Sequence, residues 1–226
     1  MKKILIIVPS RSSGGKRTSN IKELKQSWLE TTSGNSDLLI GLDDDDEHFY
    51  ERLEGLIYDI NPRLRMIGTL NLLATKYCDK YEYIAFLGDD HRFRTIGWED
   101  VFLEEAKNMK CCVFYGNDLL QGANIPTAVF MSSNIIKSLG FMVPKTLIHM
   151  YADNFWLETG KFLGILKYFN EITIEHMHPA ANKAQTDLQY IEVDSFTNHD
   201  RTNFIHYMNN EFISDMQKIK KDIIYV

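Results

Sequence analysis

The chain has few cysteines and prolines and no long apolar run, and each shortage excludes a class of protein. Its 226 residues include 3 cysteines and 5 prolines. Cys78, Cys111 and Cys112 are odd in number and lack the spacing of a metal site, so we expect buried thiols in a reducing compartment and no disulfide framework. No apolar segment of the sequence is long enough to span a bilayer. We therefore expect a cytoplasmic protein.

The chain also has fewer basic than acidic residues. The chain has 25 Lys and Arg against 31 Asp and Glu, which gives a formal net charge of −6. This balance provides no general attraction to nucleic acids or anionic membranes, although a local basic patch remains compatible with it. An apolar fraction of 44% is typical of a folded protein. A chain of this length buries a substantial core, as one domain or as a domain with a C-terminal extension.

Strand-like apolar runs alternate with helical patterns through the first half of the chain. The expected strands are residues 4–8, 37–42, 65–67, 83–87 and 111–115. The expected helices start at Ser19 or Asn20 and run through Leu29, cover residues 47–57, run from Thr69 through Tyr77, and cover residues 97–109. This alternation predicts an α/β fold with a mostly parallel central sheet flanked by helices.

The second half of the chain is less regular. Residues 128–131 and 172–175 are strand-like, a short helix is expected after Ser132 or Ser133, and another begins at Asp153. From about Asp200 onward, apolar residues recur at helical spacing, which predicts a long amphipathic helix. We expect one domain over residues 1–195, with residues 196–226 forming a C-terminal helix packed on it.

Acidic and polar residues follow three of the expected strands. Ser10-Arg11 follows the first, the run Asp43 to Asp46 follows the second, and Asp89-Asp90 follows the strand at 83–87. Ligands of mostly parallel sheets bind beyond the carboxyl ends of the strands, so we expect these groups to meet there. The run of four aspartates either stabilises a helix N-terminus or accepts hydrogen bonds from a nucleoside, and one role does not exclude the other.

The adjacent carboxylates of Asp89 and Asp90 repel each other, so a nearby cation would stabilise them. Mg²⁺ or Mn²⁺ is the natural candidate, because both ions take oxygen ligands and bridge carboxylates to phosphates. A solvated acidic turn is the alternative. His176 and His178 lie two apart at the end of a strand and face the same side of the sheet, which makes them candidate metal ligands. Imidazole ligands favour Mn²⁺ over Mg²⁺.

Two further residues carry alternative interpretations. Lys183, on a polar segment, is either an exposed lysine or a contact for a phosphate. Asp153 lies at a helix start among aromatic residues, where it is either an N-cap or a general base whose pKa is raised by its surroundings. Trp98 and Trp156 belong either to the core or to the wall of a sugar site.

At these positions the chain resembles the nucleotide-sugar glycosyltransferases of the GT-A fold, and among them the family 2-like enzymes of bacteria and phages. The resemblance covers residues 3 to 190 and is strongest at Gly88–Trp98. It is carried by Ile7-Val8-Pro9-Ser10-Arg11 with Ser27-Trp28 and Thr31-Thr32, by Ser36-Asp37 and Leu42-Asp43-Asp44, by Phe86 to Thr95 with Gly97-Trp98, and by His176-Met177-His178-Pro179 with Lys183 and Asp187.

The resemblance implies a GT-A, Rossmann-like fold and a metal-dependent transfer of a sugar from a nucleotide-sugar donor, expected to be UDP-linked, to an acceptor hydroxyl. It implies that Asp90 binds Mn²⁺ or Mg²⁺ together with His176 or His178, and that Asp153 deprotonates the acceptor. The donor-binding residues would be Pro9, Ser10, Arg11, Asp43, Asp44, Asp89 and Lys183. A base opposite the leaving group favours inversion at the anomeric carbon. The sequence leaves open the oligomeric state and whether the acceptor is a glycan, a protein or modified DNA.

Two other functions remain as alternatives. A sugar-phosphate nucleotidyltransferase uses a similar sheet and metal-bound aspartates, but Ser10–Arg17 matches its Gly-rich, basic signature poorly. A non-catalytic nucleotide-sugar binding module needs no base, so replacing Asp153 distinguishes such a module from an enzyme.

Overall fold

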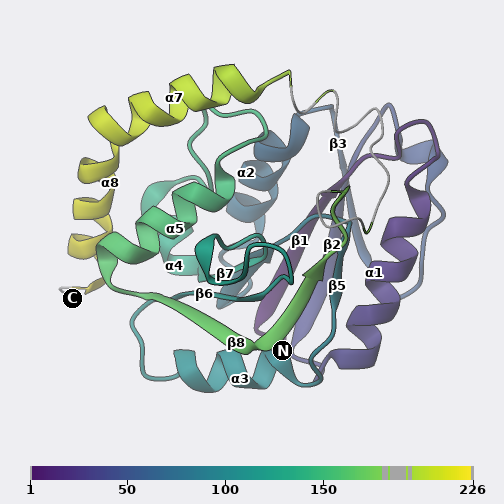
Figure 1. Ribbon diagram of the computed structural model, residues 1–226, viewed down its shortest axis with the longest axis horizontal. Coiled ribbons are helices and arrows are strands. Elements are labelled where there is room, and N and C mark those ends of the chain that lie inside the picture. The colour runs from purple at the N-terminus through teal and green to yellow at the C-terminus, as the bar shows by residue number, and fades with distance from the viewer. Residues whose placement is uncertain (1, 180–182, 184–191, 193–194, 225–226) are drawn as a thin grey trace.

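The computed structural model describes residues 2–179, 183, 192 and 195–224. Its central element is one mixed β-sheet. Over these residues the sheet has eight strands in the order β3-β2-β1-β4-β7-β6-β8-β5 (Figure 1). The strands are β1 (Ile4–Ser10), β2 (Ser36–Asp43), β3 (Ile57–Asn61), β4 (Tyr83–Phe86), β5 (His91–Phe93), β6 (Val113–Asn117), β7 (Val129–Ser132) and β8 (Leu166–His176). β3, β2, β1 and β4 run parallel, whereas β7 is antiparallel to both of its neighbours.

The long strand β8 pairs with two different strands. Its first residues run parallel to β6, and its last three, from Ile174 to His176, are antiparallel to β5. In the second register His176 lies directly opposite His91. Strand pairing therefore brings together two histidines that are far apart in the sequence.

Helices cover both faces of the sheet (Figure 1). They are α1 (Thr18–Thr31), α2 (Arg65–Tyr77), α3 (Trp98–Ala106), α4 (Ser133–Leu139), α5 (Ala152–Leu163), α7 (Thr197–Asn210) and α8 (Phe212–Ile219), with short turns η1 (Glu47–Phe49), η2 (Gly122–Asn124) and η4 (Lys220–Ile224). Ile4, Ile6 and Val8 of β1 pack in a cluster with α1 and α3, whereas Leu5 and Ile7 pack with α2, α4 and α5. All five side chains are fully buried, as expected for a parallel strand covered on both sides. The prediction of an α/β fold with a mostly parallel central sheet is confirmed.

Two predictions of secondary structure in the first half of the chain are wrong. The helix expected at 47–57 is reduced to the single turn η1, and the strand β3 begins at its end. The backbone N–H of Leu53 donates to the hydroxyl of Tyr58, five residues later, at 3.0 Å instead of to a carbonyl one turn earlier, so a bond to a side chain replaces the helical bond. The strand expected at 65–67 is the first turn of α2, because Ile67 belongs to the buried helical stripe that continues at Leu70.

The first residues of α1 and α2 differ from the expected ones. Thr69, expected as a cap, lies inside α2, and Arg17 rather than Ser19 or Asn20 precedes the first residue of α1. Neither helix has a side-chain hydrogen bond at its cap position. The preference of serine and asparagine for cap positions therefore did not locate the start of α1.

The single C-terminal helix expected from about Asp200 is divided into α7 and α8, with a break at Glu211. In Figure 1 α7 runs along the top of the molecule and α8 descends along its side. Phe212, Met216 and Ile219 of α8 are buried in the same cluster as α4 and α5. Because the chain bends at Glu211, the apolar side chains of α8 can pack against α4 and α5. A straight continuation of α7 would point away from them.

The other predicted strands agree with the structure. The strands expected at 4–8, 37–42, 83–87, 111–115, 128–131 and 172–175 all correspond to observed strands. The three cysteines are buried and unpaired. Among the helices that the structure describes, none has both the length and the apolar character required to cross a membrane.

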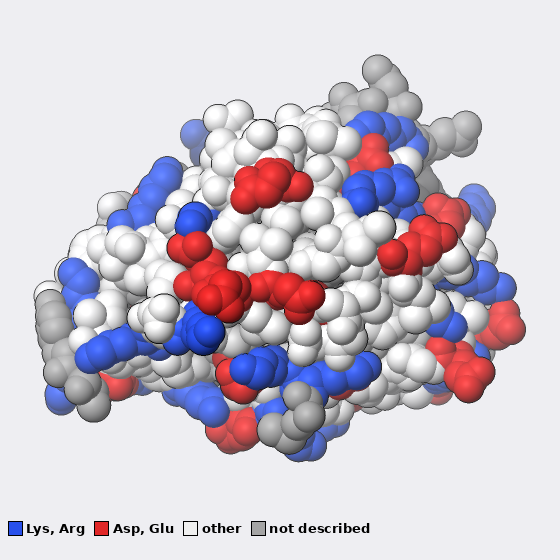
Figure 2. Space-filling model, turned by 90° about the horizontal axis from the view of Figure 1, so that it is seen from below, with Lys and Arg blue, Asp and Glu red and all other residues white. Residues whose placement is uncertain are grey.

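The side of the molecule on which α3 lies carries charges of both signs (Figure 2). Pairs such as Lys167 with Glu105, at 2.7 Å, contribute to this pattern. In Figure 2 acidic side chains lie near the centre and also toward the right and lower edges, with basic side chains between and around them. This face therefore offers no continuous basic surface to a polyanion.

Candidate active site

A pocket with a volume of about 690 Å³ lies beyond the carboxyl ends of β1, β2 and β4. Most of the predicted site residues line it, namely Pro9, Ser10, Arg11, Asp43, Asp89, Asp90, Asp153, His176 and His178. Arg17, His91 and Thr127, which the sequence analysis did not single out, line it as well. The fold thus gathers the groups that follow separate strands into one cavity, as expected for this type of sheet.

Two predicted donor-binding residues do not line the pocket. Asp44 is exposed, and its backbone N–H donates to the carbonyl of Asn61 at 2.9 Å. The ammonium group of Lys183 pairs with Glu175 at 2.8 Å. The pocket geometry therefore lends no support to a donor contact from Asp44 or Lys183. Asp187, which is part of the resemblance, lies outside the described residues.

The acidic run after β2 holds the segment that follows β1. Arg11 Nη1 donates to Asp43 at 2.7 Å and to Asp45 at 2.8 Å. Asp46 accepts hydrogen bonds from the Ser12 backbone N–H at 2.6 Å and from the Ser12 hydroxyl at 2.7 Å. Burial raises the pKa of Asp43, although the bond from Arg11 opposes the shift. The run therefore orders a loop, and Asp43 remains on the pocket wall.

Asp89 is held by three side chains. The Ser10 hydroxyl donates to its Oδ2 at 2.5 Å, and Arg17 and Asn20 donate to its Oδ1 at 2.9 Å and 3.1 Å. The side chain is buried, and hydrogen bonds with a counter-charge replace the water that it loses. Of the two carboxylates, that of Asp90 lies with two histidine nitrogens in a group that could hold a metal ion.

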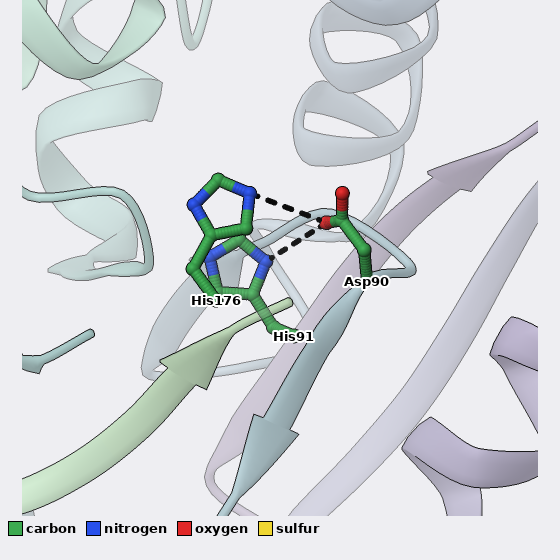
Figure 3. A group of neighbouring side chains, drawn as sticks. All are labelled: Asp90, His91 and His176. Atoms are coloured by element: carbon green, nitrogen blue, oxygen red, sulfur yellow. Dashed lines mark ion pairs between the residues drawn. The ribbon is translucent and has the colours of Figure 1, made fainter. Parts of the chain in front are cut away.

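Asp90, His91 and His176 point toward one another (Figure 3). Asp90 Oδ1 lies 3.4 Å from His91 Nδ1 and 3.5 Å from His176 Nε2, and the two imidazole rings stack with centroids 4.1 Å apart. A Cβ atom at Gly88 would lie 2.5 Å from Asp90 Oδ1, so a side chain at position 88 would force this carboxylate to move. Burial alone would raise the pKa of Asp90, but the neighbouring imidazole of His176 holds it well below its ordinary value.

The hydrogen bonds around His91 indicate which of its two ring nitrogens carries the proton. The Thr127 hydroxyl donates to Asp118 at 2.8 Å, so its oxygen is left to accept from His91 Nε2, 3.5 Å away. With Nε2 protonated, Nδ1 carries the lone pair that faces Asp90. His91 Nδ1 is buried without a hydrogen-bond partner, and burial lowers the pKa of this imidazole, which favours the neutral form.

This arrangement fits a metal ion. One ligand atom each from Asp90, His91 and His176 lies within 4.8 Å of the others, and the facing lone pairs of a carboxylate and an imidazole need a cation between them. Mixed oxygen and nitrogen ligands suit Mn²⁺. His178, expected as a ligand, lies beside the group with its ring centroid 5.0 Å from that of His176. His91, which was not among the expected ligands, is the third member of the group; the pairing of β5 with β8 would have revealed this residue, but the sequence did not predict that pairing.

Asp153 lies in the first turn of α5 and lines the pocket. Tyr151 precedes the helix in the left-handed region, with a φ of 72°, so the interpretation of Asp153 as an N-cap is wrong. Burial raises the pKa of Asp153 to about 6, while His176 opposes the shift. A carboxylate with this pKa has the basicity expected of a general base near neutral pH.

The two tryptophans belong to the core. Trp98 lies in the cluster with α1 and Trp156 in the cluster with α2, and both are almost completely buried. Neither lines the pocket. Of the two interpretations, the one that places them in a sugar-binding wall is therefore wrong.

No protein-family model and no curated protein matches this sequence. Solved structures do match it by shape. TarS from S. aureus in complex with UDP-GlcNAc has a TM-score of 0.54 and 14% sequence identity, over 81% of this chain and 62% of that one. GalNAc-T7 with UDP, GalNAc and Mn²⁺ has a TM-score of 0.56 and 12% identity, over 77% of this chain and 43% of that one.

The fold is GT-A-like. At 12% to 14% identity the similarity concerns the fold alone, and it agrees with the mixed sheet. The matched part of the TarS structures is limited, since this chain spans 36% to 62% of their lengths. The GT-A-like fold that the resemblance implied is thus confirmed from the tertiary structure.

Proposed function

We propose that this protein is a metal-dependent glycosyltransferase, of the family 2-like bacterial and phage type, which transfers a sugar from a UDP-linked donor to an acceptor hydroxyl. The observation that carries the proposal is one pocket that contains two kinds of group. Asp90, His91 and His176 form a cation site, and Asp153 supplies a carboxylate of raised pKa. TarS binds UDP-GlcNAc and GalNAc-T7 was solved with UDP, GalNAc and Mn²⁺, which supports the same chemistry here.

Asp90, His91 and His176 would hold the metal ion, and His178 is a further candidate because its ring lies next to that of His176. The histidine nitrogens favour Mn²⁺, with Mg²⁺ as the second choice. When bound, a divalent ion offsets the charge that develops on the leaving diphosphate. Glycine at position 88 lets the carboxylate of Asp90 approach the backbone at this point.

Pro9, Ser10, Arg11 and Asp43 are the proposed contacts of the nucleoside, since they line the pocket at the ends of β1 and β2. Arg11 is oriented by Asp43 and Asp45. Asp89 is proposed to support the nucleoside indirectly, because its hydrogen bond with Ser10 fixes the end of β1.

Asp153 is the proposed base. With a pKa of about 6, it is mostly ionised at neutral pH and is a stronger base than an ordinary aspartate. It would take the proton of the acceptor hydroxyl during attack on the anomeric carbon, which contributes about 10²- to 10⁴-fold to the rate. Direct displacement of this kind inverts the anomeric configuration.

A panel of nucleotide sugars tests the proposal. Thermal unfolding is measured for each nucleotide sugar with Mn²⁺ and with EDTA, and release of UDP is followed in parallel. A ligand at 100 times its dissociation constant stabilises the native state by about 2.7 kcal/mol, which is readily measured. We expect one UDP-sugar to stabilise the protein only with Mn²⁺ and to release UDP slowly by transfer to water.

The outcomes separate the alternatives. Stabilisation by UDP-sugars without UDP release, even with a library of sugar acceptors, would indicate a binding module. Formation of a nucleotide sugar from UTP and a sugar 1-phosphate would indicate the nucleotidyltransferase. If no nucleotide sugar stabilised the protein under either condition, the proposed function would be wrong.

A further inference from the structure

Arg17 lies between the two adjacent aspartates of the pocket. Its Nη2 is 2.9 Å from Asp89 Oδ1 and 3.7 Å from Asp90 Oδ2. The Arg17 side chain is 13% exposed and lines the pocket, so water screens these charges only partly. From the sequence, a metal ion was the expected counter-charge for the two carboxylates; in the structure the guanidinium of Arg17 provides one.

The position of Arg17 is held by the backbone on both sides. Its own N–H donates to the carbonyl of Ser12 at 2.9 Å, and its carbonyl accepts from the N–H of Asn20 at 3.0 Å. Ser12 is itself bound to the buried Asp46, and the Asn20 side chain donates to the same oxygen of Asp89 as Arg17 does. Arg17 is therefore a placed counter-charge, and a surface arginine that reaches the pocket by chance would lack these supports.

This counter-charge opposes a second cation. A divalent ion at Asp90, His91 and His176 would share the carboxylate of Asp90 with the guanidinium of Arg17, so the two positive groups repel each other across a partly buried site. A diphosphate in the pocket changes the balance, because its negative charges attract both the metal ion and the guanidinium. The two ligands then favour each other's binding.

We propose that Arg17 couples metal binding to diphosphate binding: it weakens the affinity of the Asp90–His91–His176 site for a divalent cation until a nucleotide diphosphate is bound. The proposal rests on the proposed function, since it takes the diphosphate to be that of the donor. By linkage, the factor by which UDP tightens Mn²⁺ binding equals the factor by which Mn²⁺ tightens UDP binding, and such factors are typically about 5- to 150-fold.

Calorimetric titration of Mn²⁺ into the full-length protein, with and without saturating UDP, tests the proposal. In the wild type we expect UDP to tighten Mn²⁺ binding by about tenfold or more. Arg17→Met removes the charge but retains much of the apolar stem, and we expect this variant to bind Mn²⁺ alone about tenfold more tightly than the wild type, with a smaller effect of UDP. Arg17→Lys keeps the charge and should retain most of the coupling.

Lys16→Met is the matched control, because Lys16 is exposed and precedes Arg17 on the same segment. It removes the same charge from a place where solvent screens it, so its Mn²⁺ affinity should equal that of the wild type. The proposal is overturned if Arg17→Met binds Mn²⁺ alone no more tightly than Lys16→Met, or if UDP has the same effect on both.

Two further outcomes keep the test decisive. If Arg17→Met does not fold, the titrations of the wild type still test the proposal. Equal Mn²⁺ affinity with and without UDP would overturn it. If the wild type binds no UDP with or without Mn²⁺, the proposed function fails. The comparison of Mn²⁺ affinity between the variants then still reports whether Arg17 opposes the cation.

Discussion

The carboxylate of Asp200 accepts a hydrogen bond from the backbone N–H of Met150 at 2.8 Å. The N–H groups of Ile148 and His149 donate to the same carboxylate at 2.9 Å and 2.8 Å. Asp200 is completely buried, and although burial would raise its pKa, these bonds and His199 hold the pKa below its ordinary value. A residue of α7 therefore fixes the loop that leads into α5 and Asp153.

Replacing Asp200 by Asn should impair turnover more than donor binding. The amide has one acceptor oxygen, and its NH₂ group would face backbone donors, which costs about 1–3 kcal/mol of stability. The loop that leads into α5 would shift and displace Asp153, and we expect kcat to fall by about 10- to 100-fold. Steady-state kinetics and calorimetric UDP binding separate the two effects.

Asp215→Asn in α8 is the matched control for this prediction. Asp215 accepts a hydrogen bond from the Tyr207 hydroxyl at 2.7 Å and does not line the pocket. It should lower stability without a comparable loss of kcat. If both variants lost stability and kept the same kcat, Asp200 would have only a structural role.

The pH dependence of kcat should report the ionisation of Asp153. Since burial raises its pKa to about 6, turnover is expected to rise with pH through that value and to level off above pH 7. Asp153→Asn should retain UDP and Mn²⁺ binding and lose turnover by about 10²-fold or more. A variant with normal turnover would show that Asp153 is not the base.

The same ionisation should lower the stability of the folded protein. Because the pKa is about 6 in the folded state and 3.8 ordinarily, the folded state holds its proton more tightly, and stability falls as the pH rises from 4 to 6. The loss is complete above pH 6 and amounts to at most about 3 kcal/mol. Asp153→Asn should therefore be more stable than the wild type at pH 7.5 and similar to it at pH 4. Urea unfolding at the two pH values measures the difference; equal stability at pH 7.5 would contradict it.

Thr127→Val should weaken metal binding although Thr127 is not a proposed ligand. Without the hydroxyl, His91 Nε2 loses its acceptor and the lone pair at Nδ1 is no longer favoured. Loss of such a support typically lowers metal affinity by about 10- to 100-fold. Calorimetry with Mn²⁺ and UDP measures the loss, with the exposed Thr75→Val as control. An affinity equal to that of the control would refute the assigned tautomer.

The sequence predicted the part of the site that depends on local pattern. Each of β1, β2 and β4 is an apolar run that ends at polar residues, and the ends of such runs meet at one edge of a parallel sheet. Ser10, Asp43 and Asp90 were therefore placed together correctly before any contact was known. The expectation for residues 47–57 failed because contacts such as that of Leu53 with Tyr58 override helical period.

Contacts between distant segments were beyond the sequence. His91 joins the proposed cation site through its register with His176, across more than 80 positions of the chain. Arg17 reaches Asp89 from the segment before α1, and Asp200 reaches the loop at 148–150 from the C-terminal helix. None of these pairs has a periodic or local signature.

The amino-acid order by itself determined which strands are buried on both faces and which carboxylates follow them, because burial and alternation act within a few residues. Which cation balances Asp89 and Asp90, which histidine faces Asp90, and which residue holds the segment before Asp153 were decided only by the tertiary structure. The reason is that desolvation and charge pairing depend on distances through space, and packing sets those distances once the whole chain has folded.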